Sequence, residues 1–263
     1  MTRHHHLFST TRRPDSGNAL WFVLLAIALL VALTVVITRS SENTEETGAR
    51  DRSRILASDI LRQAKGMEQA INTMRMQGIG ENDISFDTPE LTGYGNTNCG
   101  DSSLNTDDDP CKIFHRDGGG LSYKKPGTEW LDSSRSTETT PQYGEWYFHA
   151  ISCVPGVGTG GSGCLSNASE TELFVILPWI KQDICTEINR LTGVPNLSSP
   201  ARPPTIDGTA WDASATKFTG TFSTDSEVNT ASDSFKSHPT GCFAGDTSDP
   251  NGGYHFYHVL IPR

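Results

Sequence analysis

The histidines are the residues of this chain best suited to acid–base or metal chemistry, because imidazole titrates near neutral pH. Five of them lie beyond residue 100: His115, His149, His238, His255 and His258. His255 and His258 fall three positions apart in an expected strand, so their side chains face opposite sides and cannot bind one metal ion together. The chain also contains no G-x-S-x-G and no H-E-x-x-H sequence. We therefore expect no catalytic residues and no enzymatic activity.

Two acidic turns have the oxygen ligands that calcium prefers. One contains Asp246, Asp249 and Asn251, and the other is the aspartate run 107–109. Neither follows the EF-hand spacing, so a solvated acidic loop is the alternative. We expect no cofactor apart from calcium, and the first turn is the preferred candidate for it.

Charge and composition exclude two kinds of phosphate binding. A net charge of −10 supplies no basic face, so we expect no nucleic-acid partner. The glycine-rich segment 156–163 lacks the Lys-Ser/Thr pair of a phosphate-binding loop, and Cys164 follows it directly. We interpret this segment as a flexible loop between Cys153 and Cys164.

The cysteines indicate the redox compartment. All six lie in the C-terminal part of the chain: Cys99, Cys111, Cys153, Cys164, Cys185 and Cys242. An even number in such a position indicates disulfides formed in an oxidising compartment. Fifteen pairings are possible, and proximity along the chain favours Cys99 with Cys111 and Cys153 with Cys164, which leaves Cys185 for Cys242. A zinc site is the alternative, but the chain has no C-x-x-C pair.

Short apolar runs between polar turns fill residues 81–263, which predicts a β-rich domain of the α+β class. The expected strands cover residues 120–124, 145–153, 172–177 and 254–261. A helix is expected near 178–192, starting at Pro178 and ending at Gly193, with an apolar face of Ile180, Ile184, Ile188 and Leu191. Residues 196–237 have few large apolar side chains, so we expect a polar surface excursion anchored by Trp211, Phe218 and Phe222.

A second helical pattern lies before this domain. Within residues 40–80, a polar linker is followed by apolar residues at helical spacing: Ile60, Ala64, Met67, Ile71 and Met74. We expect this stripe to pack along the domain, and we expect Gly78 to end the helix.

The segment 18–39 is the most apolar part of the chain. Residues 19–38 carry no charge, and about 20 apolar helical residues span the ~30 Å hydrocarbon core of a bilayer. The preceding leader, residues 1–17, contains Arg3, Arg12 and Arg13, whereas acidic residues follow the apolar run. Cationic flanks stay in the cytoplasm, so we expect a single-pass inner-membrane protein with its C-terminal domain in the periplasm or outside the cell.

The first third of the chain resembles the type IV pilin and pseudopilin superfamily. The shared features are the basic leader RRPDSG ending at Gly17, an apolar helix from Asn18, its amphipathic continuation and a disulfide-bearing β-rich domain. The segment CKIFHRDGGG, residues 111–120, is also similar to uncharacterised bacterial pilin-like envelope proteins. The family usually has Phe or Met as first mature residue and Glu as fifth, where this chain has Asn18 and Phe22.

This resemblance implies a structural role. A prepilin peptidase would cut between Gly17 and Asn18, and the apolar helix would pack against other pilin-like subunits. The chain would then be a minor pilin or pseudopilin of a type IV pilus or a type II secretion-type apparatus. The alternative is a signal-anchored envelope enzyme or ligand-binding domain unrelated to filaments.

Overall fold

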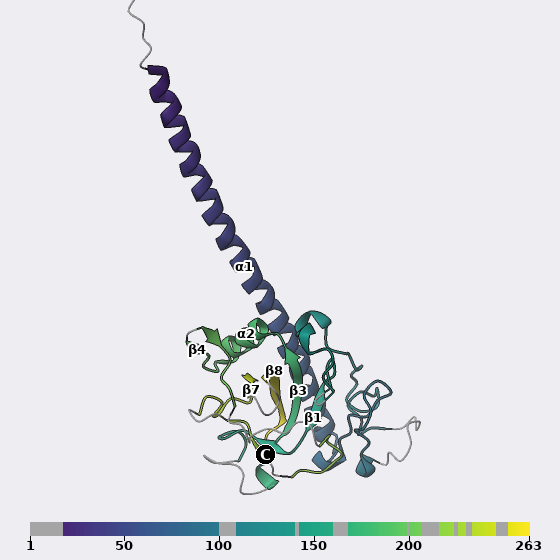
Figure 1. The fold of residues 1–263 in the computed structure, drawn as a ribbon. Helices are drawn as coiled ribbons and strands as arrows, with labels where there is room; N and C mark the ends of the chain where they lie inside the picture. Colours follow the sequence, from purple (N-terminus) through teal and green to yellow (C-terminus); the bar gives the residue numbers. More distant parts are fainter. Residues whose placement is uncertain are drawn as a thin grey trace, which may run out of the picture. The chain divides into compact units, whose positions relative to one another are not determined.

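The structure of this chain is a computed structural model that describes residues 18–99, 109–139, 142–159, 168–198, 200–206, 216–223, 226–229, 233–245 and 252–263. The side chains of residues 18–19, 36–47 and 168 are outside the description. Contacts divide the chain into two units, Met1–Arg50 and Asp51–Arg263. The fold class is α+β with a mostly antiparallel sheet, as the sequence predicts (Figure 1).

The first unit contains the start of helix α1 (Asn18–Met76). Every large apolar side chain between residues 20 and 35 is exposed, from 45% for Leu25 to 68% for Leu20. This part of α1 therefore has no buried face. Among the described residues, no helical stretch combines the length and the apolar character of a membrane span.

The part of α1 in the second unit packs through the predicted stripe. The apolar residues of this stripe are all buried: Ile60, Ala64, Met67, Ile71 and Met74. The helix ends at Met76, and Gly78 follows with a φ of 96°, which only glycine adopts without strain. The helical spacing therefore predicted the buried face correctly, and Gly78 predicted the end of this helix.

A four-stranded antiparallel sheet forms the centre of the second unit. Its spatial order is β1 (Tyr147–His149), β3 (Leu173–Ile180), β8 (Tyr254–Ile261) and β7 (Thr240–Ala244). Side chains of α1 and α2 (Gln182–Thr192) share one apolar cluster with Val175, Phe256 and Leu260 of the sheet. A second cluster contains Phe174 and Tyr257, whose side chains point to the other face. Because both faces are covered, β3 and β8 are buried almost throughout.

Smaller elements surround this sheet. The short strand β2 (Ser152–Cys153) pairs in parallel with β6 (Ser226–Glu227), and β4 (Leu197–Ser198) pairs with β5 (Ala201–Arg202) in an antiparallel hairpin. Single 3₁₀ turns cover Glu81–Asp83, Thr97–Cys99, Thr128–Trp130, Ser133–Arg135 and Ala168–Glu170.

Two of the four expected strands are present nearly as predicted, and two are not. Strand β8 has the expected bounds and β3 is three residues longer than expected at its C-terminal end, whereas residues 120–124 form no strand. The chain there folds back tightly on itself, and a Cβ at Gly118 would lie 2.1 Å from the Lys112 carbonyl oxygen. The expected strand 145–153 is interrupted after His149, because the Ala150 carbonyl accepts from Ser223 and not from a neighbouring strand of the sheet.

The predicted start of the second helix is wrong. Pro178 lies inside β3, at a bulge where the register shifts between Leu177 and Ile180. Proline is tolerated at such a bulge because it donates no ladder hydrogen bond. Helix α2 begins four residues later, at Gln182, so Ile180 belongs to the strand. Its end is as predicted, with Gly193 left-handed at a φ of 83°.

The described parts of 196–237 differ from the expected surface excursion. Ile206, Val228 and Phe235 are buried in the second apolar cluster. The expected anchors Phe218 and Phe222 do contact the first cluster, in which Phe218 is buried and against which Phe222 packs partly buried. These residues are far apart in the sequence, and together they cover parts of the sheet that a single helix could not cover. Trp211, an expected anchor, lies outside the described residues.

Candidate functional site

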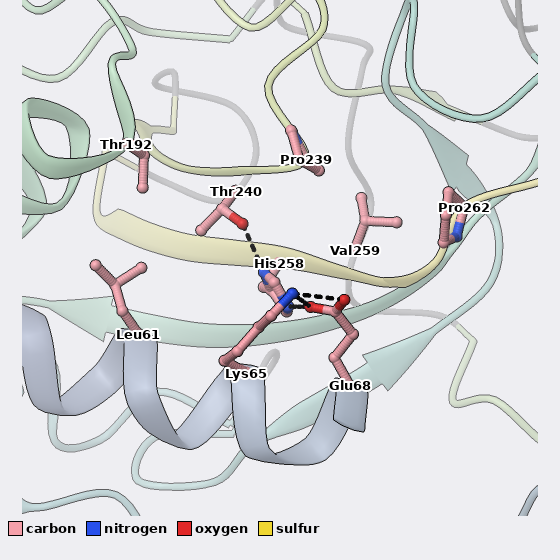
Figure 2. Close-up of a pocket in the computed structure, with 9 residues that line it drawn as sticks. All are labelled: Leu61, Lys65, Glu68, Thr192, Pro239, Thr240, His258, Val259 and Pro262. Atoms are coloured by element: carbon pink, nitrogen blue, oxygen red, sulfur yellow. Dashed lines mark hydrogen bonds and ion pairs between the residues drawn. The ribbon is translucent and has the colours of Figure 1, made fainter. Parts of the chain in front are cut away.

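A cavity of about 410 Å³ opens between α1, the end of α2 and the strands β7 and β8. Figure 2 shows its lining, which combines polar and apolar side chains: Leu61, Lys65, Glu68, Thr192, Pro239, Thr240, His258, Val259 and Pro262. All of them belong to the second unit. The volume of this cavity is in the range of small-molecule sites, which is roughly 300–1,000 Å³.

Four polar side chains of the lining form a continuous hydrogen-bonded chain (Figure 2). The Lys65 ammonium donates to both carboxylate oxygens of Glu68, at 2.7 Å each. Glu68 Oε2 lies 2.8 Å from His258 Nε2, and the other ring nitrogen, Nδ1, lies 2.5 Å from Thr240 Oγ1. A carboxylate, an imidazole and a hydroxyl are thus aligned in series.

The charge of Glu68 fixes the direction of these hydrogen bonds. The hydrogen bond with His258, together with Lys65, lowers the pKa of Glu68 from 4.5 to about 2, against the effect of partial burial. Glu68 is therefore ionised and can only accept, so His258 Nε2 carries the proton between them. In the neutral ring Nδ1 is then an acceptor, and the Thr240 hydroxyl donates to it.

The secondary structure explains why these groups meet. Lys65 and Glu68 are three residues apart, so they project from neighbouring positions of one helix. Thr240 and His258 are direct partners in the β7–β8 register, which brings their side chains together on one face of the sheet. The site could not be predicted from the sequence, because Glu68 and His258 are separated by 190 residues. The odd spacing of His255 and His258 was the available signal, since it places only one of them on each face.

The other histidines of the described ranges do not join the cavity lining. His255 packs against Trp179 and Phe243, with ring centroids 4.7 and 5.5 Å away, so it lies on the face opposite His258 as predicted. Burial lowers the pKa of His149 to about 3, which keeps that ring neutral. His115 is near Asp117, at 3.7 Å, in a loop away from this cavity, and His238 caps a turn through its backbone.

The calcium prediction falls mainly outside the described residues. Asp246, Asp249 and Asn251 all lie there, as do residues 107 and 108. Asp109 is described, and its carboxylate is buried against the Lys112 ammonium at 2.7 Å. Within the described ranges, no three His, Cys, Asp or Glu side chains are arranged to hold a metal ion.

Two of the three expected disulfides are present among the described residues. Cys99 is bonded to Cys111, and Cys185 is bonded to Cys242. Cys153 is also disulfide-bonded, while its expected partner Cys164 lies outside the description. The Cys185–Cys242 bond links α2 to β7, the strand that also carries Thr240.

Of the expected processing site, Gly17 lies outside the described residues and Asn18 is the first residue of α1. A second cavity, of about 320 Å³, lies between α1 and residues 114–124. It is lined by Met67, Phe114, Tyr123 and Trp146, among others, and lacks a hydrogen-bonded series of the kind seen around His258.

Comparison with protein-family models, curated proteins and solved structures found no match to this chain.

Proposed function

We propose that this chain is a membrane-anchored, pilin-like subunit of a type IV pilus or a type II secretion-type apparatus. In this role the apolar start of α1 lies in the inner membrane and packs against sibling helices, and the α+β domain presents its loops in the periplasm or outside the cell. The proposed activity is assembly, with the N-terminal helix as the assembling element.

The observation that carries the proposal is the contrast between the two parts of α1. In residues 20–35 the large apolar side chains are exposed on every side, whereas the stripe from Ile60 to Met74 is buried in the second unit. A soluble helix normally has a polar face, and an apolar surface this extensive favours a lipid or protein partner. The uncharged run continues in sequence to residue 38, which supports a length sufficient for a bilayer.

The disulfides support the compartment that this proposal requires. Cys99–Cys111 and Cys185–Cys242 both lie beyond the apolar run, and disulfides persist in oxidising compartments such as the periplasm. The positively charged residues before the run support retention of the N-terminus in the cytoplasm.

Alkaline extraction of membranes tests the anchor. We expect the full chain to remain in the membrane pellet after carbonate washing. Replacing Leu24 and Leu30 with aspartate should release it, because each aspartate at the centre of a membrane helix costs about 3 kcal/mol. Ile55→Asp is the matched control, since Ile55 is also exposed on α1, at 63%, but lies beyond the apolar run. Release of the unmodified chain would contradict the proposal.

Photo-crosslinking tests the assembly. A photoreactive residue in place of Leu24 should join the chain to other subunits, and the joined peptide should come from an apolar N-terminal helix. The same residue in place of Ile55 should give few such products. Adducts formed only with lipid would support an anchor without a filament role.

A further inference from the structure

We propose that Thr240 is a catalytic nucleophile that hydrolyses short-chain carboxylic esters in the cavity beside His258. This activity goes beyond the proposed structural role and does not depend on it. Thr240 and His258 would act on the substrate directly, and Glu68 would be a positioning residue.

The hydrogen-bond geometry supports this assignment. Thr240 Oγ1 lies 2.5 Å from His258 Nδ1, within reach for transfer of the hydroxyl proton. His258 Nε2 lies 2.8 Å from Glu68 Oε2, which holds the ring in the tautomer that leaves Nδ1 able to accept a proton. A hydroxyl, a base and a group that orients the base therefore stand in the order that nucleophilic catalysis requires.

Burial and charge distinguish this series from a solvated surface contact. The His258 side chain is 8% exposed and that of Glu68 is 20% exposed, so water competes weakly for their hydrogen bonds. Thr240 is half-buried and is itself part of the cavity lining. Lys65 also lines the cavity, where its ammonium donates to both carboxylate oxygens of Glu68 and helps to keep that carboxylate ionised.

The remaining lining indicates the substrate class. Leu61, Pro239 and Val259 contribute apolar surface to the same cavity, and the volume of about 410 Å³ suits a small molecule. A short acyl chain would contact this apolar surface while its carbonyl carbon faces Thr240. Large polymeric substrates would not enter a cavity of this size.

The reaction proceeds in two steps. Thr240 Oγ1 forms a bond to the ester carbonyl carbon while its proton moves to His258 Nδ1. The carbon–oxygen bond to the alcohol then breaks, and that proton passes to the leaving alkoxide. Water attacks the acyl-threonine, gives a proton to Nδ1 and releases the carboxylic acid, after which the proton returns to Oγ1. The net change is ester plus water to acid plus alcohol.

Hydrolysis of p-nitrophenyl acetate by the full chain in detergent micelles tests the proposal. We expect Thr240→Val to lower kcat/KM by about 100-fold or more, because valine keeps the shape but removes the nucleophile. Thr240→Ser should retain activity within about tenfold. Glu68→Gln should lower kcat with little change in KM, since it alters the orientation of the base and not the substrate contacts. Thr186→Val is the control, because Thr186 is a hydroxyl on α2 outside the cavity lining that bonds a helix carbonyl.

A covalent probe gives a second readout that needs no variant. A fluorophosphonate should modify the unaltered chain, and peptide mass spectrometry should place the adduct on Thr240. The proposal is overturned if the unaltered chain hydrolyses the ester no faster than Thr240→Val. An adduct on another residue, or none at all, also overturns it and leaves the hydrogen-bonded series as a structural brace.

Discussion

The carboxylate of Glu68 accepts a hydrogen bond of 2.8 Å from the imidazole of His258, across 190 residues of sequence. This contact joins α1 to β8, so the long helix is attached to the sheet by a polar link as well as by its apolar stripe. Because this hydrogen bond is partly buried, its contribution to the free energy of unfolding should be large enough to measure.

Glu68→Gln should destabilise the second unit by about 1–2 kcal/mol at pH 7, because a hydrogen bond to a charged group is replaced by a weaker neutral one. Denaturant unfolding of the full chain in micelles, followed by tryptophan fluorescence, measures this loss. Asp59→Asn is the control: its partner Arg62 is 77% exposed, and such pairs contribute about 0.5 kcal/mol or less. Equal losses in the two variants would show that burial of the Glu68 pair has no effect.

The same pair predicts a pH dependence. The pKa of Glu68 is about 2 in the folded chain against 4.5 ordinarily, so the unfolded chain binds more protons between these values. Stability from this group is therefore complete above pH 4.5 and decreases as the pH falls through 2. Unfolding free energies of the unaltered chain and of Glu68→Gln should converge over that range. A constant difference between them would contradict this assignment.

Glu172 should give the stability of the folded chain the opposite dependence on pH. Burial, reinforced by the charge of Glu170, raises the pKa of Glu172 from 4.5 to about 8, although the Val154 amide donates to it. The folded chain therefore holds a proton there that the unfolded chain has lost, and stability should fall as pH rises from 4.5 through 8. Glu172→Gln should remove this loss and be more stable than the unaltered chain at pH 9, by roughly 1–3 kcal/mol.

The half-exposed Glu170 provides the matched control for that experiment, since it lies two residues away. Glu170→Gln should leave most of the decline with pH in place. A decline that persists unchanged in Glu172→Gln would assign it to another group.

The two described disulfides should differ in their contribution to stability. Cys185 and Cys242 are 57 residues apart and Cys99 and Cys111 only 12, so the first bond removes more chain entropy from the unfolded state. Double alanine variants of each pair should differ by about 1.4 kcal/mol, with the larger loss for Cys185–Cys242. Denaturant midpoints of both variants measure this difference, and a larger loss for the short loop would refute the expectation.

Asn189 should be difficult to replace, because its buried side chain closes the edge of the sheet. Its amide donates to the Cys242 carbonyl at 2.7 Å and accepts from the Cys242 amide at 2.8 Å, which reproduces the pairing of a further strand. Asn189→Leu should cost roughly 2–4 kcal/mol, since it leaves two buried backbone groups unpaired. Asn98→Leu, at an exposed asparagine with one 3.1 Å bond, should cost less than about 1 kcal/mol.

Local patterns in the sequence were sufficient for much of the fold. The buried stripe of α1 follows the helical period, and Gly78 and Gly193 end their helices because both adopt positive φ. Strand β8 has its expected bounds because turn residues precede it and apolar residues fill it. Proximity along the chain identified the Cys99–Cys111 disulfide, and Cys185–Cys242 followed as the remaining pair.

Features that depend on distant contacts could not be predicted. Pro178 suggests a helix start in isolation, but pairing of β3 with β8 makes it part of a bulge. Residues 196–237 look polar in composition, yet Val228 and Phe235 cover a sheet face that was not known to need covering. For the same reason the cavity was missed, since Thr240 meets His258 only through the β7–β8 register, and Glu68 reaches it from another element.

The proposed role as a pilin-like subunit held by its apolar helix is tested most directly by the mass of the mature protein. Intact-mass and N-terminal analysis of the chain extracted from membranes of a host with a prepilin peptidase should show a first residue of Asn18. Gly17→Leu, which blocks the expected cut, should restore the longer chain. A protein that retains Met1 in that host would contradict the pilin assignment.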